Sequence, residues 1–267
     1  MATDQTISIS TAITPLILTF NEEPNIERTL ASLRWARRVV ILDSGSTDQT
    51  ETIARSFDNV SWHVRRFDNH CAQWDFGIRQ TGIASDYVLA LDADMATPQA
   101  FCDELQNEFL PGQYTGGITP FTYHMFGRPM TGSIYPAQLR VFRPSGVKVT
   151  QHGHTQVFSQ ETAAYQFKAP LIHDDRKPLE RWVSSQLSYS RLEAQRLAAE
   201  SSSRWRDRLR RWGIMPPVVG ALAYLRAGGP LGGAAAKRYA YERATFECLL
   251  AIRLISAEAK ELPHRND

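Results

Sequence analysis

Two carboxylates, Asp92 and Asp94, follow an unbroken apolar run at residues 87–91. Such a run predicts a strand that is buried on both faces of a parallel sheet, with its carboxyl end at the edge where ligands bind. The two-residue period of a strand puts both carboxylates on one side. Because they repel each other unless a cation lies between them, they predict a divalent metal, Mg²⁺ or Mn²⁺, and a phosphorylated ligand. An acidic turn or a helix cap is the alternative.

Three further polar clusters follow predicted strands. They read Thr-Phe-Asn-Glu-Glu at 19–23, Asp-Ser-Gly-Ser-Thr-Asp at 43–48, and His-Asp-Asp at 173–175. In a parallel sheet the first two clusters share one edge with Asp92 and Asp94, which is what a single site requires. Turn and helix capping is the alternative for Asn21 and Asp43.

The elements around these clusters alternate between strand and helix patterns. Strands are predicted at residues 13–19, 38–43, 60–64 and 87–91. This order predicts an α/β sandwich with a mostly parallel central sheet and right-handed crossovers. Ser46 and Gln49 fit a capping box that would begin a helix. Residues 116–167 are rich in turns, aromatic residues and β-branched residues, so we expect a mixed or antiparallel extension there.

Two domains are predicted from the patterns along the chain. The first is an α/β domain at residues 1–200, with a half that binds the phosphorylated ligand at about 13–112 and a half that binds the acceptor at about 113–200. Near its end, Pro178 begins a helix with its apolar residues on one stripe. That stripe comprises Leu179, Trp182, Val183, Leu187 and Leu197. The second domain, at 201–267, is a basic and apolar helical extension.

Composition excludes several classes of protein. The 267 residues are 43% hydrophobic with a net charge of only +2, which supports a sizeable core and gives no electrostatic case for nucleic acid. Three cysteines without metal spacing argue against a disulfide framework. The polar start of the chain does not resemble a signal peptide, and no apolar run is long enough to span a bilayer. We therefore expect a cytoplasmic protein, peripheral at the inner face of the cytoplasmic membrane.

In the order and spacing of Thr-Phe-Asn-Glu-Glu, Asp-Ser-Gly-Ser-Thr-Asp and Asp-Ala-Asp, the chain resembles the family 2 glycosyltransferases over about residues 13–200. The resemblance implies an inverting enzyme of the A-type fold that uses a nucleotide-diphosphate sugar. It is similar to transferases of bacterial lipopolysaccharide-core and surface-polysaccharide assembly, chiefly through residues 173–182. The resemblance implies that Asp94 binds the metal, with Asp92 near the metal and the donor ribose. It also implies a donor-binding group of Thr19, Asn21, Glu22, Asp43 and Ser44.

Attack by an acceptor hydroxyl on the donor requires a general base, because sugar hydroxyls are too weakly acidic to react unaided. Asp174 and Asp175 are the candidates, and stabilisation of the following helix start is the alternative role. His173 and Arg176 are further possible site residues. Many relatives carry a basic residue and an asparagine where this chain has Gln73-Trp74-Asp75-Phe76-Gly77, and a His-Glu pair where it has residues 152–156. If the base lies elsewhere, His154 and Glu161 are next.

The tail contains five arginines and two tryptophans at residues 204–212, from Arg204 to Trp212, followed by an apolar stretch. This composition is typical of a segment that lies on an anionic membrane surface, and a solvated basic helix is the alternative. The expected acceptor is a lipid-linked or cell-surface glycan. Two rival functions are a nucleotidyltransferase, which would need a glycine-rich phosphate loop after its first strand, and a non-catalytic membrane-peripheral relative. The oligomeric state is left open.

Overall fold

The structure, a computed structural model, describes residues 8–152, 155–199 and 205–261. The chain forms two compact units, one made of residues 1–124 and 135–177 and the other of residues 125–134 and 178–267. The functional division predicted near residue 200 stays a prediction.

The first unit contains the α/β sandwich. Its helices are α1 (Ile9–Ala12), α2 (Ile26–Ala31), α3 (Thr50–Arg55), α4 (His70–Gln80) and α5 (Gln99–Glu104), with a π-helical turn at Leu105–Phe109 and a 3₁₀ turn at Pro144–Gly146. Its strands are β1 (Ile13–Thr19), β2 (Val39–Asp43), β3 (Val60–Val64), β4 (Tyr87–Asp92), β5 (Met95–Ala96), β6 (Gly116–Thr119), β7 (Phe121–Met125), β9 (Gln138–Phe142), β10 (Lys148–His152), β11 (Thr155–Ser159), β12 (Tyr165–Gln166) and β13 (Leu171–His173).

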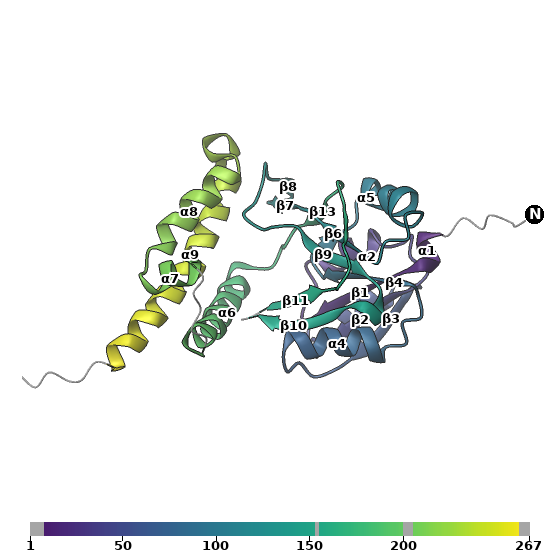
Figure 1. Cartoon of the computed structure of the whole chain (residues 1–267), viewed down its shortest axis with the longest axis horizontal. Coiled ribbons are helices and arrows are strands. Elements are labelled where there is room, and N and C mark those ends of the chain that lie inside the picture. The colour runs from purple at the N-terminus through teal and green to yellow at the C-terminus, as the bar shows by residue number, and fades with distance from the viewer. Residues whose placement is uncertain (1–7, 153–154, 200–204, 262–267) are drawn as a thin grey trace, which may run out of the picture. The chain divides into compact units, whose positions relative to one another are not determined.

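The central sheet has seven strands in the order β12, β6, β9, β4, β1, β2, β3 (Figure 1). Strands β4, β1, β2 and β3 are parallel, whereas β9 is antiparallel to both β4 and β6. The predicted α/β sandwich with a mostly parallel sheet and a mixed extension is therefore confirmed. The register pairs Thr19 with Asp43 and Leu18 with Asp92, so three of the predicted clusters end at one edge of the sheet.

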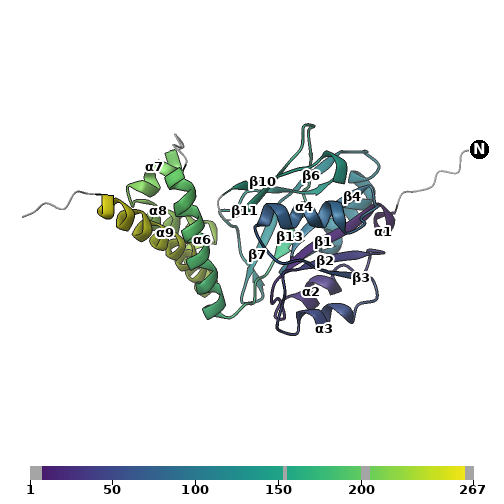
Figure 2. The same cartoon turned by 90° about the horizontal axis from the view of Figure 1, so that it is seen from below.

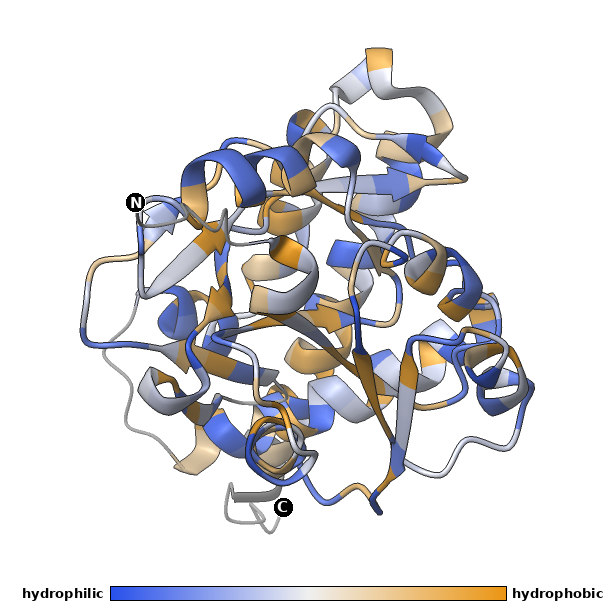
Figure 3. Ribbon diagram, turned by 90° about the vertical axis from the view of Figure 1, so that its right-hand side faces the viewer, coloured by the Kyte–Doolittle hydropathy of each residue, from blue (hydrophilic) through white to orange (hydrophobic). Residues whose placement is uncertain are grey.

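Both faces of β1, β2 and β4 are buried, which explains their largely apolar sequences, whereas the edge strand β3 is only half buried. Ile17, Ile41 and Leu89 pack with α2 and α5 on one face. The residues before them in each strand pack with Trp74 and Ile78 of α4 on the other face. Figure 2 shows α4 on one side of the sheet and α2 and α3 on the opposite side. In Figure 3 the hydrophobic colour gathers on strands at the centre of the ribbon, whereas the helices carry both hydrophobic and hydrophilic colours.

A short second sheet joins the loops that matter for function. Within the first unit it contains β5, β13 and β7 in that order. Strand β13 is antiparallel to β5, with His173 opposite Met95. The chain just after Asp94 is therefore paired with the strand that leads to Asp174 and Asp175.

The capping box predicted at Ser46 and Gln49 is wrong. Helix α3 begins only at Thr50, and its N-cap residue Gln49 makes no side-chain cap hydrogen bond. The Ser46 hydroxyl instead donates to Asp43 and accepts from the backbone N–H of Asn21. Ser46 thus joins two loops, while Asp48 Oδ1 accepts the N–H of Thr50.

The second unit is helical, as predicted for the tail. It contains β8 (Arg128–Pro129), α6 (Leu179–Ala199), α7 (Trp205–Arg211), α8 (Met215–Arg226), a 3₁₀ turn at Gly229–Gly232 and α9 (Gly233–Glu261). Among the helices of the described ranges, none is both long and apolar enough to cross a membrane. Segment 125–134 belongs to this unit: the N–H of Ile134 donates to the Tyr239 hydroxyl at 3.1 Å.

Most of the apolar stripe of α6 is not on its buried face. Leu179, Val183 and Leu187 are exposed, and the buried face is mostly polar. Its buried residues are Gln186, Ser190, Glu193, Arg196 and Leu197. The reason is an ionic interior: Arg196 pairs with Glu193 and with Asp207 of α7, and Arg210 pairs with Glu193 and with Glu247 of α9.

Candidate active site

Asp43 organises the first two polar loops. It is buried, and its two carboxylate oxygens accept hydrogen bonds from the Thr19 hydroxyl, the Ser46 hydroxyl and the N–H groups of Gly45 and Ser46. Across the same interface Asn21, with a positive φ of 53°, accepts the N–H of Thr47 on Oδ1 at 2.7 Å. The loops after β1 and β2 are therefore joined into one structure. The donor-binding role predicted for these residues stays a prediction.

Ser44 belongs to the same loop structure and accepts a hydrogen bond from Gln73 at 3.2 Å. Gln73 is fully buried and also accepts Arg65 Nη1 at 2.6 Å. Arg65 in turn binds Asp68 through both of its terminal nitrogens. The segment that departs from the family pattern thus connects the nucleotide-side loops to an arginine that the sequence reasoning did not single out.

Asp92 already has a cationic partner within the protein. Arg140 of β9, which is 4% exposed, donates Nη2 to Asp92 Oδ2 at 3.2 Å. Burial would raise the pKa of Asp92, but Arg140, His173 and His70 together hold that pKa below its usual value. Asp92 is therefore ionised at neutral pH and oriented by Arg140.

Asp94, in contrast, has an unused oxygen. The residue is 7% exposed, and its Oδ1 has no hydrogen-bond partner among the described residues. The nearest basic atom to Oδ1 is His173 Nε2 at 3.6 Å, and the His173 ring packs on Tyr123. A buried carboxylate oxygen without a partner is costly, so Asp94 is suited to bind a ligand that supplies positive charge.

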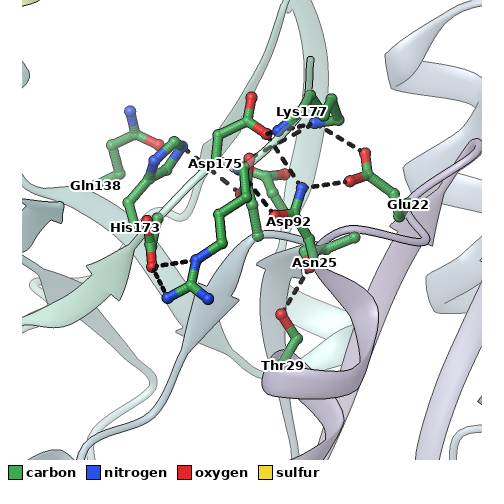
Figure 4. A network of polar contacts seen from close by, with 12 residues as sticks. Glu22, Asn25, Thr29, Asp92, Gln138, His173, Asp175 and Lys177 are labelled. Atoms are coloured by element: carbon green, nitrogen blue, oxygen red, sulfur yellow. Dashed lines mark hydrogen bonds and ion pairs between the residues drawn. The ribbon is translucent and has the colours of Figure 1, made fainter. Parts of the chain in front are cut away.

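Lys177 is the main site residue that the sequence analysis missed. Its ammonium lies 3.0 Å from Glu22 Oε1, 3.3 Å from Asp175 Oδ1 and 3.8 Å from Asp94 Oδ2. Figure 4 shows Lys177 and Asn25 between Glu22 and Asp175. Burial raises the pKa of Glu22 to about 7 although Lys177 opposes it. Burial also opposes the charge of Lys177, but the surrounding carboxylates raise its pKa above the usual value.

Asp174 and Asp175 have different environments. Asp174 is 2% exposed, and its Oδ2 accepts two hydrogen bonds from Arg176, at 2.7 and 3.0 Å. Its N–H donates to the backbone oxygen of Asp94 at 3.0 Å, and its own carbonyl accepts Arg28. These contacts give Asp174 a structural position between two arginines.

Asp175 uses only one of its oxygens. Oδ1 accepts from Asn25 Nδ2 at 3.1 Å and from the N–H of Lys177 at 3.1 Å, and it also pairs with the Lys177 ammonium. Within the described residues Oδ2 has no partner, and the side chain is 30% exposed. Burial would raise the pKa of Asp175, but Lys177 and the two hydrogen bonds keep that pKa below its ordinary value. Asp175 thus offers an ionised, accessible oxygen beside Asp94.

The remaining candidate bases are not placed in this cluster. Glu161 is largely exposed and pairs with Lys148. His154 lies outside the described residues. The structure therefore brings together Glu22, Asp92, Asp94, His173, Asp174, Asp175 and Arg176, with the loop of Thr19, Asn21, Asp43 and Ser44 beside them.

A divalent cation at this site would find few ligands on the protein itself. No group of three or more His, Cys, Asp or Glu side chains is arranged to hold a metal within the part of the chain that the structure describes. Asp94 has one carboxylate oxygen without a hydrogen-bond partner among the described residues. Glu22 and Asp94 both lie near the Lys177 ammonium. Such a donor set fits a cation that takes most of its ligands from phosphate oxygens and water, as Mg²⁺ does.

Acidic loops lie at the carboxyl edge of a mostly parallel α/β sheet, which is where open α/β folds bind their ligands. The sequence model for glycosyl transferase family 2 matches residues 16–169, which is more than half of the chain. The chain belongs to glycosyl transferase family 2. The family match gives no support to a nucleotidyltransferase.

Individual relatives are more distant. The succinoglycan biosynthesis protein ExoA of Rhizobium meliloti (strain 1021) is 33% identical over 119 residues, 41% of this chain and only 36% of ExoA. The lipopolysaccharide core biosynthesis glycosyltransferase LpsC of the same organism is 22% identical over 230 residues, 81% of this chain and 82% of LpsC. Among solved structures, S. aureus TarS with UDP-GlcNAc aligns over 96% of this chain and 94% of that one, with 12% identity and a TM-score of 0.45.

Proposed function

We propose that this chain is an inverting glycosyltransferase that moves a sugar from a nucleotide-diphosphate donor to a hydroxyl of a lipid-linked or cell-surface glycan. The observation that carries the proposal is that Asp94 Oδ1 and Asp175 Oδ2 each lack a hydrogen-bond partner among the described residues. They lie on two loops that are joined by the backbone hydrogen bond from the N–H of Asp174 to Asp94. One oxygen suits the leaving-group side of the reaction. The other suits the acceptor side.

Asp175 acts as the general base in this proposal. Its Oδ2 takes the proton of the acceptor hydroxyl as the acceptor oxygen forms a bond to the anomeric carbon, while the bond from that carbon to the diphosphate oxygen breaks. Attack from the face opposite the leaving group inverts the anomeric configuration. Asn25 and Lys177 hold Asp175 Oδ1, so Oδ2 is presented in one orientation.

Asp94, with Asp92 beside it, would hold a divalent cation, Mg²⁺ or Mn²⁺, together with the donor diphosphate. When bound, the cation supplies Lewis-acid stabilisation of the negative charge on the leaving diphosphate. Arg140 fixes the orientation of Asp92. The Lys177 ammonium counters the charge of Glu22 and Asp94 until ligands arrive.

The acceptor is proposed to be part of a lipopolysaccharide core or an exopolysaccharide. The extent of the similarity to the lipopolysaccharide core transferase LpsC, 82% of its length, supports this class. A lipid-linked acceptor places the reaction at the cytoplasmic face of the membrane, and the basic tail segment that ends at Trp212 is the proposed contact with anionic lipid. Arg204 of that segment lies outside the described residues.

The test compares Asn variants of the two adjacent aspartates. Asp175→Asn keeps the size of the side chain and most of its hydrogen bonding but removes the proton acceptor, so turnover is expected to fall by about a hundredfold or more with donor affinity unchanged. Asp174→Asn is the matched control. It weakens the ion pair with Arg176, so it is expected to lower the melting temperature. Its turnover, measured at a temperature at which the variant is folded, is expected to stay close to that of wild type. Near-wild-type turnover of Asp175→Asn would remove Asp175 from the mechanism. The anomeric configuration of the product, read by NMR, tests inversion.

A further inference from the structure

Helix α8 has two apolar faces, and only one of them is covered. Met215, Val219 and Ala223 are buried where α8 packs along α9, as Figures 1 and 2 show. Gly220 lets the two helices approach, since a Cβ there would lie 3.2 Å from Ala244 Cβ. The opposite face is exposed although it carries no charge between Ile214 and Leu225.

The exposed face is a continuous stripe at helical spacing. Ile214, Val218 and Leu222 are each separated by four residues and are between 43% and 44% exposed, and Leu225 is 68% exposed. Pro217 and Ala221 are exposed between them. Leu231, in the 3₁₀ turn that follows, is 98% exposed. An apolar face of this length is unfavourable in water and marks a contact surface.

Exposed tryptophans and arginines border the stripe at its start. Trp205 and Trp212 are 62% and 64% exposed. Arg206 stacks on the Trp205 ring and Arg208 on the Trp212 ring, with guanidinium-to-centroid distances of 5.4 and 5.6 Å. Tryptophan and arginine together are favoured where an apolar interior meets a charged surface.

The charge of this surface has one sign. Between Asp207 and Glu242 the sequence has six Lys and Arg residues and no acidic residue. Asp207 itself is 3% exposed and is paired with Arg196. A stripe of leucine, isoleucine and valine bordered only by cations matches a surface that is anionic outside and apolar beneath, which is a bilayer containing anionic lipid.

We infer that the exposed face of α8, from Ile214 to Leu225 with Leu231, inserts into the interface of an anionic membrane, with Trp205, Arg206, Arg208 and Trp212 at the headgroups. The inference deepens the proposed function and rests on it only for the location of the acceptor. It also assigns contact with the membrane to only some of the arginines in the tail. Arg210 is excluded, because it is held by Glu193 and Glu247 inside the unit.

The experiment measures sedimentation of the full chain with phosphatidylcholine vesicles that contain 30% phosphatidylglycerol and with vesicles of phosphatidylcholine alone. Wild type is expected to bind the anionic vesicles, and less at high salt. Leu225→Glu is expected to bind at least about tenfold more weakly. Ile252→Glu is the matched control, because Ile252 is 61% exposed in the same unit but is a residue of α9 that does not belong to this stripe, so its binding is expected to equal wild type. The double variant Arg206→Gln with Arg208→Gln is expected to bind about thirtyfold more weakly, at about fivefold per arginine.

Equal binding of wild type and Leu225→Glu, or equal loss in Ile252→Glu, would overturn the inference. Self-association of wild type without vesicles, abolished by Leu225→Glu, would also overturn it and assign the face to a second copy of the chain. The Asp94→Asn variant separates the two proposals, since it is expected to keep vesicle binding. Vesicle binding without any sugar transfer by wild type would contradict the proposed function and leave the surface in place.

Discussion

Replacement of Lys177 by methionine tests the electrostatics of the acidic cluster directly. The ammonium of Lys177 is 3.0 Å from Glu22 Oε1 and 3.8 Å from Asp94 Oδ2, and its side chain is only 16% exposed. Methionine keeps much of the side-chain length without the charge. The variant leaves three carboxylates, those of Glu22, Asp94 and Asp175, without their shared cation.

The expected loss can be worked from that geometry. Unit charges at this separation interact by about 5 kcal/mol at an effective dielectric constant near 20. The cost of desolvating the charges offsets part of this attraction. The loss of one partner of a buried ion pair therefore costs about 3 kcal/mol of stability or more. For a domain of this size, about 3 kcal/mol corresponds to a melting temperature lower by about 6–12 °C.

Mn²⁺ should reverse most of that loss in the variant. A ligand at about 100 times its dissociation constant stabilises the native state by about 2.7 kcal/mol, close to the loss itself. In wild type Mn²⁺ must displace Lys177 from Asp94, so the rise in melting temperature is expected to be smaller. The assay is thermal unfolding of both proteins in chelator and in a Mn²⁺ series, without nucleotide.

Lys168→Met is the matched control. Lys168 pairs with Glu108 at 3.4 Å, but its side chain is 80% exposed, so its removal is expected to leave the melting temperature unchanged in either condition. The reasoning about Lys177 is refuted if Lys177→Met melts like wild type in chelator, or if Mn²⁺ raises both melting temperatures equally.

Two further predictions concern single side chains. Asp94→Asn should abolish most sugar transfer and most metal-dependent binding of nucleotide sugars, measured by calorimetry. It should not unfold the protein, because Asp94 Oδ1 accepts no hydrogen bond from the described residues. Full activity of this variant, or of wild type in excess chelator, would contradict the metal role. Arg210→Gln should destabilise the second unit by about 3 kcal/mol, because its ion pairs with Glu193 and Glu247 are lost. Arg206→Gln should not destabilise it. Equal melting temperatures of the two variants would disprove the ionic interior.

The sheet could be predicted from the sequence because its strands are apolar on both faces. An apolar sequence of strand length fits only a strand buried on both faces, as in Val39–Asp43 and Tyr87–Asp92. The aspartate at the end of each strand marks the edge of the sheet. The partners of those ends could not be predicted. Arg140 reaches Asp92 from β9, a strand with no pattern that singles out a buried arginine.

Lys177 and the interior of the second unit were missed for a related reason. Lys177 follows a run of charges before a helix, where a solvated lysine is the ordinary expectation, and only its placement beside Glu22 reveals its role. The sequence predicted an apolar stripe on helix α6, but ion pairs between residues far apart in the sequence bury its polar face instead. Periodicity reports hydrophobicity along one helix, and it does not report which charges a neighbouring helix supplies.

The helical unit is discontinuous in sequence, because residues 125–134 belong with residues 178–267. The N–H of Ile134 is bonded to Tyr239, and a Cβ on Gly132 would lie 2.9 Å from the backbone oxygen of Arg226. A truncation after Lys177 would therefore leave a ten-residue hairpin segment without the helices that receive it, and a fragment starting at Pro178 would lack a piece of its own interior. The two units can be separated cleanly only by a design that replaces the loop at 125–134 and supplies it again, fused to the helical fragment.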